Sequence, residues 1–471
     1  MPIETHTSPK LSVDQREGTV AGPGGSVRLE PKVMGVLVAL ATHSGRVVSR
    51  DELLGTVWPG AVVTEHTLSR CIYQLRNVLR KVGSVTDEAD YKPIETLPKR
   101  GYRLLATVEM SSSSGSSTAR TLSSELPMIP FVVGQWVRGD RFYGRRAQIR
   151  EILEGHRNCI WLLGTRRIGK TSLLKQIEHI ADTSLDHRYF PIFWDFQGAG
   201  TPEEFHLGFG DALLDADERL EHIGIGVADV QADDLFVSLK RLRRRLRSKD
   251  LKLLLLCDEV EELIELHQQD PSLLRKLRHD MQSREDIRTV LASTIRLWAL
   301  ADQNEDTSPF LHGFTPPLYI EQFSDQEARS LIEQSHLSPE ERPCIEEGVV
   351  EAIRVHCDNH PYLLQLVCKR YLESGNLEET IELVATDEMV SYFFSVDFEM
   401  LSEAEREIVH IIARESESGD TIRGKLSLGS DTLDGTLRRL ENLGLIRRND
   451  DSRFALSNYF FRRWLKKTSL F

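Results

Sequence analysis

One stretch of the chain constrains the fold more than any other: a glycine-bounded loop between an apolar run and a helical pattern. Residues 159–163 (CIWLL) are apolar, residues 164–172 read GTRRIGKTS, and residues 173–177 (LLKQI) follow with helical spacing. This order satisfies G-x-x-x-x-G-K-[ST] in the strand–loop–helix setting that the pattern requires. We therefore expect an α/β domain whose loop amides turn inward around phosphate oxygens.

Individual residues of this loop have distinct expected roles. Lys170 adds a positive charge for the outer phosphates of a nucleotide, and the Thr171 hydroxyl suits Mg²⁺. The start of the following helix favours the anion further. The predicted nucleotide-binding residues of the loop are Gly164, Thr165, Arg166, Arg167, Ile168, Gly169, Lys170, Thr171 and Ser172.

A second apolar run further along the chain ends in two carboxylates. Residues 253–256 are leucines, and Cys257, Asp258 and Glu259 follow them, as in a buried strand of a parallel sheet. Asp258 would hold Mg²⁺ through water, and Glu259 would polarise an attacking water. With Lys170, these two are the predicted catalytic residues. A nucleotide with Mg²⁺ is the expected ligand, and slow hydrolysis is favoured over none.

Residues around these two runs resemble the STAND and archaeal-ATPase-like proteins. The resemblance covers about residues 140–375 and rests on FYGRR at 142–146, RRIGKTS at 166–172, TVLAST at 289–294 and HPYLL at 360–364. It implies an α/β ATPase core with a helical lid, in which ATP/ADP exchange controls conformation or assembly. It further implies Phe142, Gly144, Arg145 and Pro361 as nucleotide-binding residues, and Ser293, Thr294 and Arg296 as sensors of the outer phosphate.

The chain departs from that family at one position of the lid. Asn359 stands where the family's G-x-P motif has its glycine. Because asparagine tolerates left-handed backbone angles better than most residues, the turn that leads into His360 and Pro361 is expected to survive.

Near the N-terminus the pattern is three helices followed by a basic hairpin. Residues 32–42 have apolar positions on one helical face, and Ser49 with Glu52 reads as a capping box before a helix that stops at Pro59-Gly60. A third helix is expected over 65–81, with an inner stripe of Leu68, Ile72, Leu75 and Leu79. Two short strands, 94–97 and 102–105, flank a basic turn. This order predicts a winged helix.

Residues 27–108 resemble the OmpR/PhoB-type response-regulator DNA-binding domain, through GRVVSRDELL at 45–54, Val57-Trp58, Leu75-Arg76 and Gly101-Tyr102-Arg103. Arg70, Gln74 and His66 match the base-facing positions of that family, where a helix enters the major groove. Arg76, Arg80, Lys99 and Arg100 would contact phosphates. The predicted DNA-binding residues are His66, Ser69, Arg70, Tyr73, Gln74, Arg76, Asn77, Arg80, Lys99 and Arg100. The alternative is a winged helix that binds protein.

A similar helix-and-hairpin pattern occupies residues 396–471. Ser402 and Glu405 form a second predicted capping box, residues 431–443 read as a helix with Gly444 after it, and 445–456 reads as a hairpin. This segment resembles the C-terminal winged helix found beside archaeal-type ATPase cores. It is either a second DNA contact, through Arg438, Arg439, Arg447 and Arg448, or a packing module that reports nucleotide state. The second interpretation is favoured.

Two other clusters have plainer explanations. The basic run KRLRRRLR at 240–247 has Leu239, Leu242 and Leu246 at helical spacing, which favours a surface helix over a nucleic-acid patch. His356, Cys357 and His360 have no fourth ligand nearby and are not expected to hold a metal ion. The six cysteines form no C-x-x-C pair and are expected to be reduced and mostly buried.

Length and charge set the outer limits. A chain of 471 residues suggests about three domains. A net charge of −13 argues against a nucleic-acid coat or a membrane-surface protein, and neither a membrane span nor an export signal is expected. The predicted order is a loosely ordered segment 1–25, a winged helix 26–110, a Ser-rich linker 111–128, a P-loop ATPase core 129–320, a helical lid 321–395 and a C-terminal winged helix 396–471.

Together these patterns predict a cytoplasmic, ATP-dependent transcriptional regulator of multidomain fold. Its nucleotide state would bias self-association into a homo-oligomer, and paired winged helices would then bind double-stranded DNA with greater avidity. A protein partner or the nucleotide itself would supply the signal. The alternative function is a DNA-processing or defence ATPase, similar to an initiator or a transposition helper, that assembles on DNA.

Overall fold

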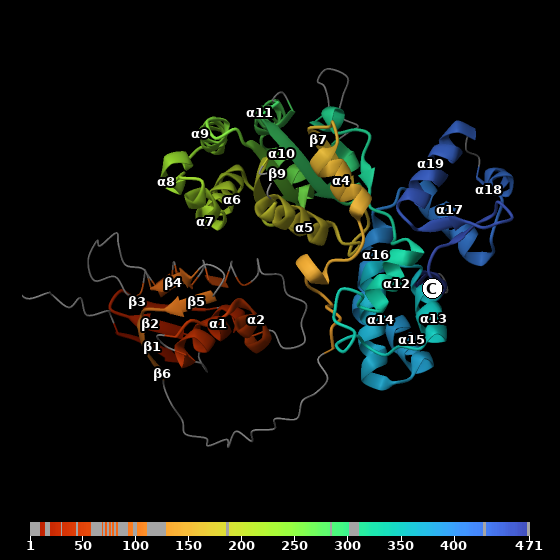
Figure 1. Ribbon diagram of the computed structural model, residues 1–471, viewed down its shortest axis with the longest axis horizontal. Coiled ribbons are helices and arrows are strands. Elements are labelled where there is room, and N and C mark those ends of the chain that lie inside the picture. The colour runs from red at the N-terminus through yellow and green to blue at the C-terminus, as the bar shows by residue number, and fades with distance from the viewer. Residues whose placement is uncertain are drawn as a thin grey trace, which may run out of the picture. The chain divides into compact units, whose positions relative to one another are not determined.

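The computed structural model describes residues 10–14, 19–29, 31–43, 46–57, 68, 71–72, 75–76, 78–79, 82, 93–97, 101–110, 129–184, 188–282, 285–300, 310–426 and 430–468. The chain divides into two compact units, Met1–Pro127 and Met128–Phe471 (Figure 1). Each unit has its own hydrophobic core, so each is described by itself.

The first unit begins with a small sheet. Strands β1 (Lys10–Asp14), β2 (Thr19–Gly22), β3 (Gly25–Arg28) and β6 (Thr107–Met110) lie in the order β3-β2-β1-β6, with β1 antiparallel to β2 and parallel to β6. The expectation that residues 1–25 are loosely ordered is therefore wrong for β1 and β2. Leu11, Val13 and Val20 are almost completely buried. These few apolar residues form one buried face of the sheet, which is hard to recognise in a sequence that is rich in Gly and Pro.

The rest of the first unit follows the predicted order. Helix α1 spans Pro31–Thr42 and α2 spans Arg50–Val57. The capping box before α2 is present, since the amide of Glu52 donates to Ser49 Oγ and the amide of Ser49 donates to Glu52 Oε2, both at 3.1 Å. In the expected third helix the four inner-stripe residues are all at most 1% exposed: Leu68, Ile72, Leu75 and Leu79.

A two-stranded hairpin closes the first unit. Strand β4 (Ile94–Leu97) pairs antiparallel with β5 (Gly101–Leu104), and the basic turn between them lies outside the described residues. Gly101 has φ of +124°, and a Cβ there would lie 2.0 Å from the carbonyl oxygen of Val48. Glycine is needed because Val48 and Tyr102 form a β-bridge at this point.

The second unit contains a parallel sheet of five strands in the order β11-β7-β10-β9-β8. The strands are β7 (Cys159–Leu163), β8 (Tyr189–Asp195), β9 (Lys252–Asp258), β10 (Ile287–Ser293) and β11 (Leu318–Tyr319). Both predicted apolar runs are strands of this sheet. The order places β10 between β7 and β9, so the carboxyl ends of all three meet at one edge.

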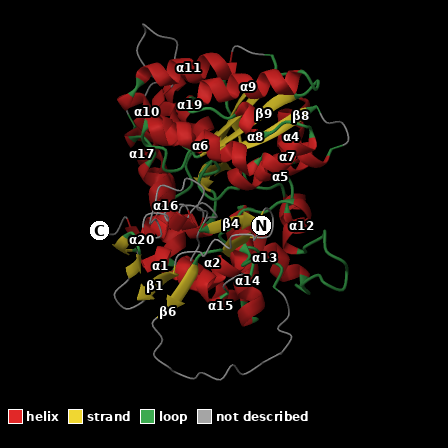
Figure 2. Ribbon diagram, turned by 90° about the vertical axis from the view of Figure 1, so that its left-hand side faces the viewer, coloured by secondary structure: helices red, strands yellow, loops and turns green. Residues whose placement is uncertain are grey.

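Helices cover both faces of this sheet, which explains why apolar residues on both faces of its central strands are buried. On β9, Leu254 and Leu256 face the core formed with α4 (Arg146–Glu154) and α5 (Lys170–Thr183), whereas Leu253, Leu255 and Cys257 face the opposite core. That opposite core is formed with α6 (Pro202–Asp215), α9 (Leu235–Arg247), α10 (Leu263–Gln269) and α11 (Pro271–Gln282). Figure 2 shows the strands running between helices.

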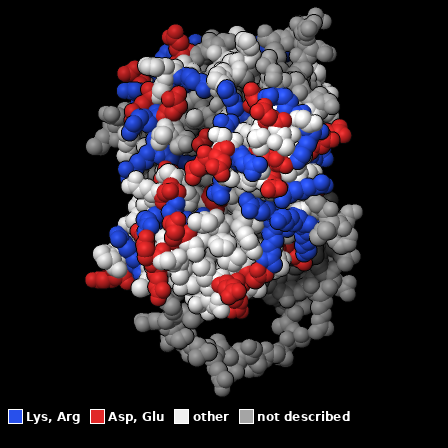
Figure 3. Space-filling view, turned by 90° about the vertical axis from the view of Figure 1, so that its right-hand side faces the viewer, with Lys and Arg blue, Asp and Glu red and all other residues white. Residues whose placement is uncertain are grey.

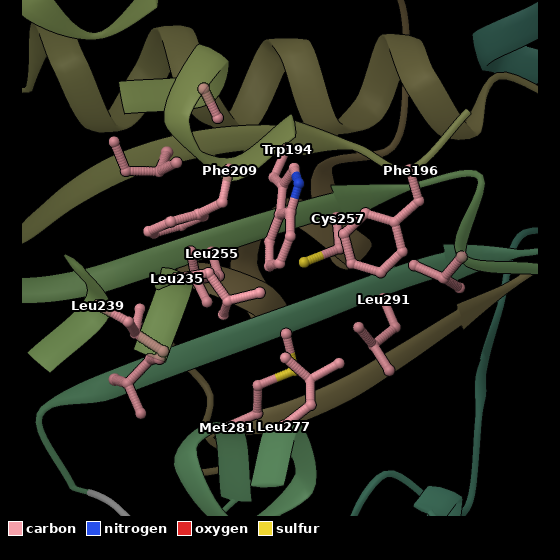
Figure 4. Packing of buried hydrophobic residues seen from close by; sticks show 14 of the residues in the cluster. Trp194, Phe196, Phe209, Leu235, Leu239, Leu255, Cys257, Leu277, Met281 and Leu291 are labelled. Atoms are coloured by element: carbon pink, nitrogen blue, oxygen red, sulfur yellow. The ribbon is translucent and has the colours of Figure 1, made fainter. Parts of the chain in front are cut away.

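Aromatic side chains fill the second of these cores. The ring of Trp194 lies 4.5 Å from that of Phe196 and 4.9 Å from that of Phe209, and all three are at most 1% exposed. Figure 4 shows them beside Cys257 on β9 and Leu235 and Leu239 on α9. Because protein interiors are close-packed, these rings hold the end of β8 in place. The short helices α7 (Asp217–His222) and α8 (Val227–Val230) connect α6 to α9.

A helical segment follows the sheet. It consists of α12 (Asp325–Ile332), α13 (Glu347–Cys357), α14 (Pro361–Ser374), α15 (Leu377–Ala385) and α16 (Glu388–Glu399). The predicted boundary between residues 395 and 396 falls inside α16. Side chains of α12–α16 share one core cluster with the C-terminal elements. Helix α16 therefore belongs to the same hydrophobic core as the helices before it and the elements after it.

The C-terminal elements are α17 (Glu403–Arg414), α18 (Gly419–Lys425), α19 (Ser430–Asn442), the antiparallel pair β12 (Ile446–Arg448) and β13 (Phe454–Leu456), and α20 (Tyr459–Thr468). The capping box of Ser402 and Glu405 is present. Gly444 follows α19 with φ of +68°, as a helix-terminating glycine does. This is the element order that was expected for a winged helix.

The structure describes all six cysteines, and none of them forms a disulfide; five are buried, whereas Cys344 between α12 and α13 is exposed. Burial raises the pKa of Cys159 to about 11. No helix among the described residues is long and apolar enough to cross a membrane. Figure 3 shows acidic and basic side chains interspersed over one face.

Candidate functional site

The glycine-bounded loop lies between the end of β7 and the start of α5. Gly164 is fixed by packing, since a Cβ there would lie 2.9 Å from Ile168 Cγ2 and 3.2 Å from the carbonyl oxygen of Ile320. Gly169 has φ of +101°, a left-handed angle that ends the loop immediately before α5. Lys170 Nζ donates to the carbonyl oxygens of Gly164 (3.1 Å) and Thr165 (2.9 Å). The side chain of Lys170 therefore folds back onto the phosphate loop.

Asp258 meets this loop, as the sequence predicted. It is the last residue of β9, and Thr171 at the start of α5 donates its hydroxyl to Asp258 Oδ2 at 2.6 Å. The backbone amide of Glu259 donates to Asp258 Oδ1 at 3.1 Å. The two predicted Mg²⁺ ligands, a hydroxyl and a carboxylate, are thus adjacent. Such oxygen donors are those that Mg²⁺ prefers.

Carboxylates crowd this edge of the sheet. Asp195 ends β8 directly opposite Asp258 in the parallel register. Burial first, and then the charge of Asp195, raise the pKa of Asp258 to about 6. Desolvation by the surrounding residues, and then the charges of Asp258 and Glu261, raise the pKa of Glu259 to about 7, although the residue is exposed. This concentration of negative charge favours a bound cation.

Asp195 and Glu261 were not among the predicted site residues. A signal for Asp195 was available, because residues 189–194 are an apolar run that ends in an aspartate, like the run before Asp258. Parallel neighbouring strands bring such terminal carboxylates together. Glu261 carried no comparable signal. It lies in the 3₁₀ turn Val260–Glu262, and its position depends on the left-handed backbone of Glu259 (φ 49°).

The predicted sensor residues are engaged with neighbours on the sheet. Ser293 Oγ accepts from Trp161 Nε1 at 2.7 Å. The amide and hydroxyl of Thr294 both donate to Glu261 Oε1 at 2.5 Å. Arg296 is exposed, and its charge acts on Glu262. Thr294 is therefore linked to the carboxylate cluster through Glu261, whereas a role for Arg296 at the phosphate stays a prediction.

Arg145 is hydrogen-bonded to the backbone of the phosphate loop. Its side chain is buried and donates to the carbonyl oxygens of Ile168 (3.2 Å) and Glu321 (2.6 Å), and its guanidinium lies 4.6 Å from the ring centre of Phe323. Burial lowers its pKa to about 10, so it stays charged at neutral pH. Arg145 thereby joins the phosphate loop to the segment that begins the helical lid.

Phe142 and Gly144, which the same resemblance implied, lie close to the core and to the side chain of Glu327. Phe142 lies in the core cluster with Ile168. Gly144 has φ of +72°, and a Cβ there would meet the side chain of Glu327 at 2.7 Å. The amide of Arg145 donates to that glutamate, again at 2.7 Å. These contacts position the loop, and direct contact of Phe142 or Gly144 with a nucleotide stays a prediction.

The lid turn has the backbone that the sequence predicted. Asn359 has φ of +54°, and Pro361 is the first residue of α14. His360 is buried, which lowers its pKa to about 3 and keeps the ring neutral. Arg167 of the phosphate loop lies 4.5 Å from the ring centre of Tyr362. The lid and the loop therefore touch beside Pro361.

Most of the predicted DNA-binding residues lie outside the described part of the chain: His66, Ser69, Arg70, Tyr73, Gln74, Asn77, Arg80, Lys99 and Arg100. Arg76 is described, and its Nε donates to the carbonyl oxygen of Ile94 at 3.3 Å. This bond ties the third helix to β4. Contacts of the predicted set with DNA stay predictions.

Residues 24–104 match the family described as "Transcriptional regulatory protein, C terminal". The first unit carries a DNA-binding domain of this family. The domain is similar to part of the transcriptional activator CadC of Escherichia coli K12, at 42% identity over 85 residues, which are 18% of this chain and 16% of CadC. The chain is also similar to part of the transcriptional regulator HilA of Salmonella typhi, at 32% identity over 128 residues, which are 27% of this chain and 21% of HilA.

The second unit has the fold of a P-loop ATPase. A solved Walker-type ATPase of Pyrococcus abyssi is 18% identical, covers 70% of this chain and 98% of its own, and superposes with a TM-score of 0.51. At this identity the likeness shows the fold alone. The DNA-binding domain is thus joined to a P-loop ATPase fold in one chain, as the sequence resemblances implied. The chain spans 16% and 21% of the two curated relatives, CadC and HilA.

Proposed function

We propose that this protein is an ATP-dependent, DNA-binding transcriptional regulator whose nucleotide state controls self-association and promoter binding. One observation carries the proposal. A chain with a transcriptional-regulator DNA-binding domain at residues 24–104 also has a phosphate loop whose Thr171 is hydrogen-bonded to Asp258. Neither part alone would link nucleotide to DNA.

The loop amides and Lys170 would bind the phosphates, and the start of α5 would add its favourable dipole. Thr171 and Asp258 would hold Mg²⁺, directly or through water. When bound, Mg²⁺ would neutralise charge on the phosphates and orient them. Glu259 would accept a proton from the attacking water. Hydrolysis is proposed to be slow, as suits a switch.

On the DNA side, the outer face of the third helix would read bases in the major groove, and Lys99 and Arg100 would contact phosphates. Residues 1–110 contain 14 Lys and Arg against 12 Asp and Glu, so one copy would bind weakly. A nucleotide-dependent homo-oligomer would place several copies on paired half-sites and raise avidity. A protein partner is proposed as a further source of the signal.

The decisive experiment measures binding to recovered genomic target DNA with and without Mg-ATP, for the wild type and Lys170→Ala. We expect ATP to tighten binding and increase the oligomer mass of the wild type, and to do neither for the variant. Equal affinity and equal mass in all four conditions would rule out the switch.

A second candidate function, a DNA-processing ATPase, is favoured by a groove between α9 and α11 that is lined by six Lys and Arg residues against three Asp. The leucines of α9 (Leu235, Leu239, Leu242 and Leu246) are buried in the core, as expected for a surface helix. Its opposite face lines a cavity of about 850 Å³ together with Arg275 and Lys276 of α11. Arg243 and Arg247 are paired with Asp286, whereas Lys240, Arg244 and Arg275 face solvent.

The two candidates differ in turnover. A processing enzyme that holds DNA in this groove would hydrolyse ATP many times faster when DNA is added, and Lys240→Gln with Arg244→Gln would remove that stimulation. A regulator would hydrolyse slowly with or without DNA and would protect a defined sequence. Lys249→Gln with Arg150→Gln, both exposed and outside the groove, controls for lost charge.

A further inference from the structure

A carboxylate from a distant helix reaches into the phosphate loop. Asp397, near the end of α16, accepts a hydrogen bond from the backbone amide of Arg166, with its two oxygens at 3.2 and 3.3 Å from the nitrogen. The residue is 6% exposed. The positive charges of Lys170 and Arg166 act on it, yet burial raises its pKa to about 6. The proposed chemistry does not use Asp397.

The donors that hold Asp397 are those that a nucleotide needs. Loop amides and Lys170 attract an anion, and two anions placed against the same donors repel each other. Arg166 Nε is also buried without a hydrogen-bond partner among the described residues, so this side of the loop offers a further donor. A carboxylate here acts as an internal substitute for phosphate.

We propose that Asp397 competes with nucleotide phosphate for the Arg166 amide, and so sets how strongly the loop favours ADP over ATP. This inference rests on the proposed function, because it requires the loop to bind nucleotide. The more negative triphosphate meets the greater repulsion, and its binding must displace the carboxylate. Binding energy for ATP is thereby spent on moving α16.

Helix α16 carries that displacement to the C-terminal elements. One turn before Asp397, Phe393 lies 5.9 Å from His360 and 5.7 Å from Tyr362, at the lid turn. On the other side, Phe394 lies 5.2 Å from Phe461, and Phe398 lies 5.7 Å from Trp464, both in α20. A shift of α16 therefore repacks α20, because close-packed aromatic cores transmit strain.

The test uses the full-length chain carrying Asp397→Asn, which removes the charge and keeps the shape. Affinities for ATP and ADP in Mg²⁺ are measured by calorimetry, with Asp397→Glu as the charge-retaining variant and Glu399→Gln as a matched control on an exposed position of α16. We expect Asp397→Asn to tighten ATP about tenfold and ADP less, while the other two behave like the wild type. An Asn variant that binds ATP equally or more weakly would overturn the proposal.

Hydrogen exchange gives a second readout that a merely structural role would not move. In the wild type, ATP should change exchange in peptides from α16 and α20, and in Asp397→Asn most of this difference should already be present without nucleotide. Identical, nucleotide-dependent exchange in both proteins would also overturn the inference. Failure of the proposed function looks different: the wild type would then bind ATP no better than Lys170→Ala.

Discussion

At the level of single residues, the sequence predicted that the loop and Asp258 would lie together, and Thr171 is hydrogen-bonded to Asp258; both are recognisable because they are tied to local sequence. The carboxylates around them depend on strand order and register, which no local pattern states. Asp195 stands opposite Asp258 only because β8 pairs with β9 in that register. Asp397 comes from a helix far along the chain and carries no local signal at all.

Asp258→Asn should stabilise the second unit when no divalent cation is present. Its carboxyl has a pKa of about 6 in the folded chain against 3.8 ordinarily, so the folded state holds this proton more tightly. The ionised form therefore costs stability above pH 6, and the cost disappears towards pH 4. We expect a gain of about 1–3 kcal/mol at pH 8, shrinking at pH 5, as measured by denaturant unfolding. A gain that is independent of pH would contradict this, and Mg²⁺ should reduce it.

Arg145→Met should lower the stability of the second unit by about 2–4 kcal/mol, because the change leaves the Ile168 and Glu321 carbonyls without their buried donor. Arg146→Met is the matched control, since Arg146 is the neighbouring residue and is exposed. Urea unfolding measures both. Equal effects of the two substitutions would mean that the buried hydrogen bonds of Arg145 contribute nothing.

At the level of elements, helices and strands with strong periodicity were predictable, and short strands with few apolar residues were not. The buried stripe of the third helix and both capping boxes follow from spacing. Strand β1 has five residues and β2 has four. Such short strands show too little alternation of apolar and polar residues to be recognised beside the neighbouring Gly and Pro. The boundary near residue 395 was misplaced because α16 packs on both of its neighbours.

The turn between α13 and α14 contains Asn359, which stands where the family's motif has a glycine, and substitutions there test how the turn is stabilised. Asn359→Ala should lower the free energy of unfolding by about 1–2 kcal/mol. Alanine is strained at the left-handed φ of +54°, and it loses the hydrogen bond to Asp325 at 2.8 Å. Asn359→Gly relaxes the backbone and loses only the hydrogen bond, so its cost should be smaller. Thermal unfolding of the two variants gives the order, and the reverse order would exclude backbone strain as the cause.

At the level of the whole molecule, the fusion of two units was predictable from two independent motifs, whereas their coupling was not. Each unit has a separate core, so calorimetry of the full chain should show two unfolding transitions. Mg-ATP at a hundred times its dissociation constant should stabilise one transition by about 2.7 kcal/mol, and duplex DNA should shift the other. A single joint transition, or a shift of both by ATP alone, would contradict independent folding.

The uneven burial of the thiols has a practical consequence. Five of the six sulfhydryls are sealed in the interior, and only Cys344 meets solvent, in the connection between α12 and α13. A maleimide dye added to the unmodified native chain should therefore attach at a single known place on the lid. Fluorescence from that dye would let lid motion be followed in real time without engineering any residue of the protein.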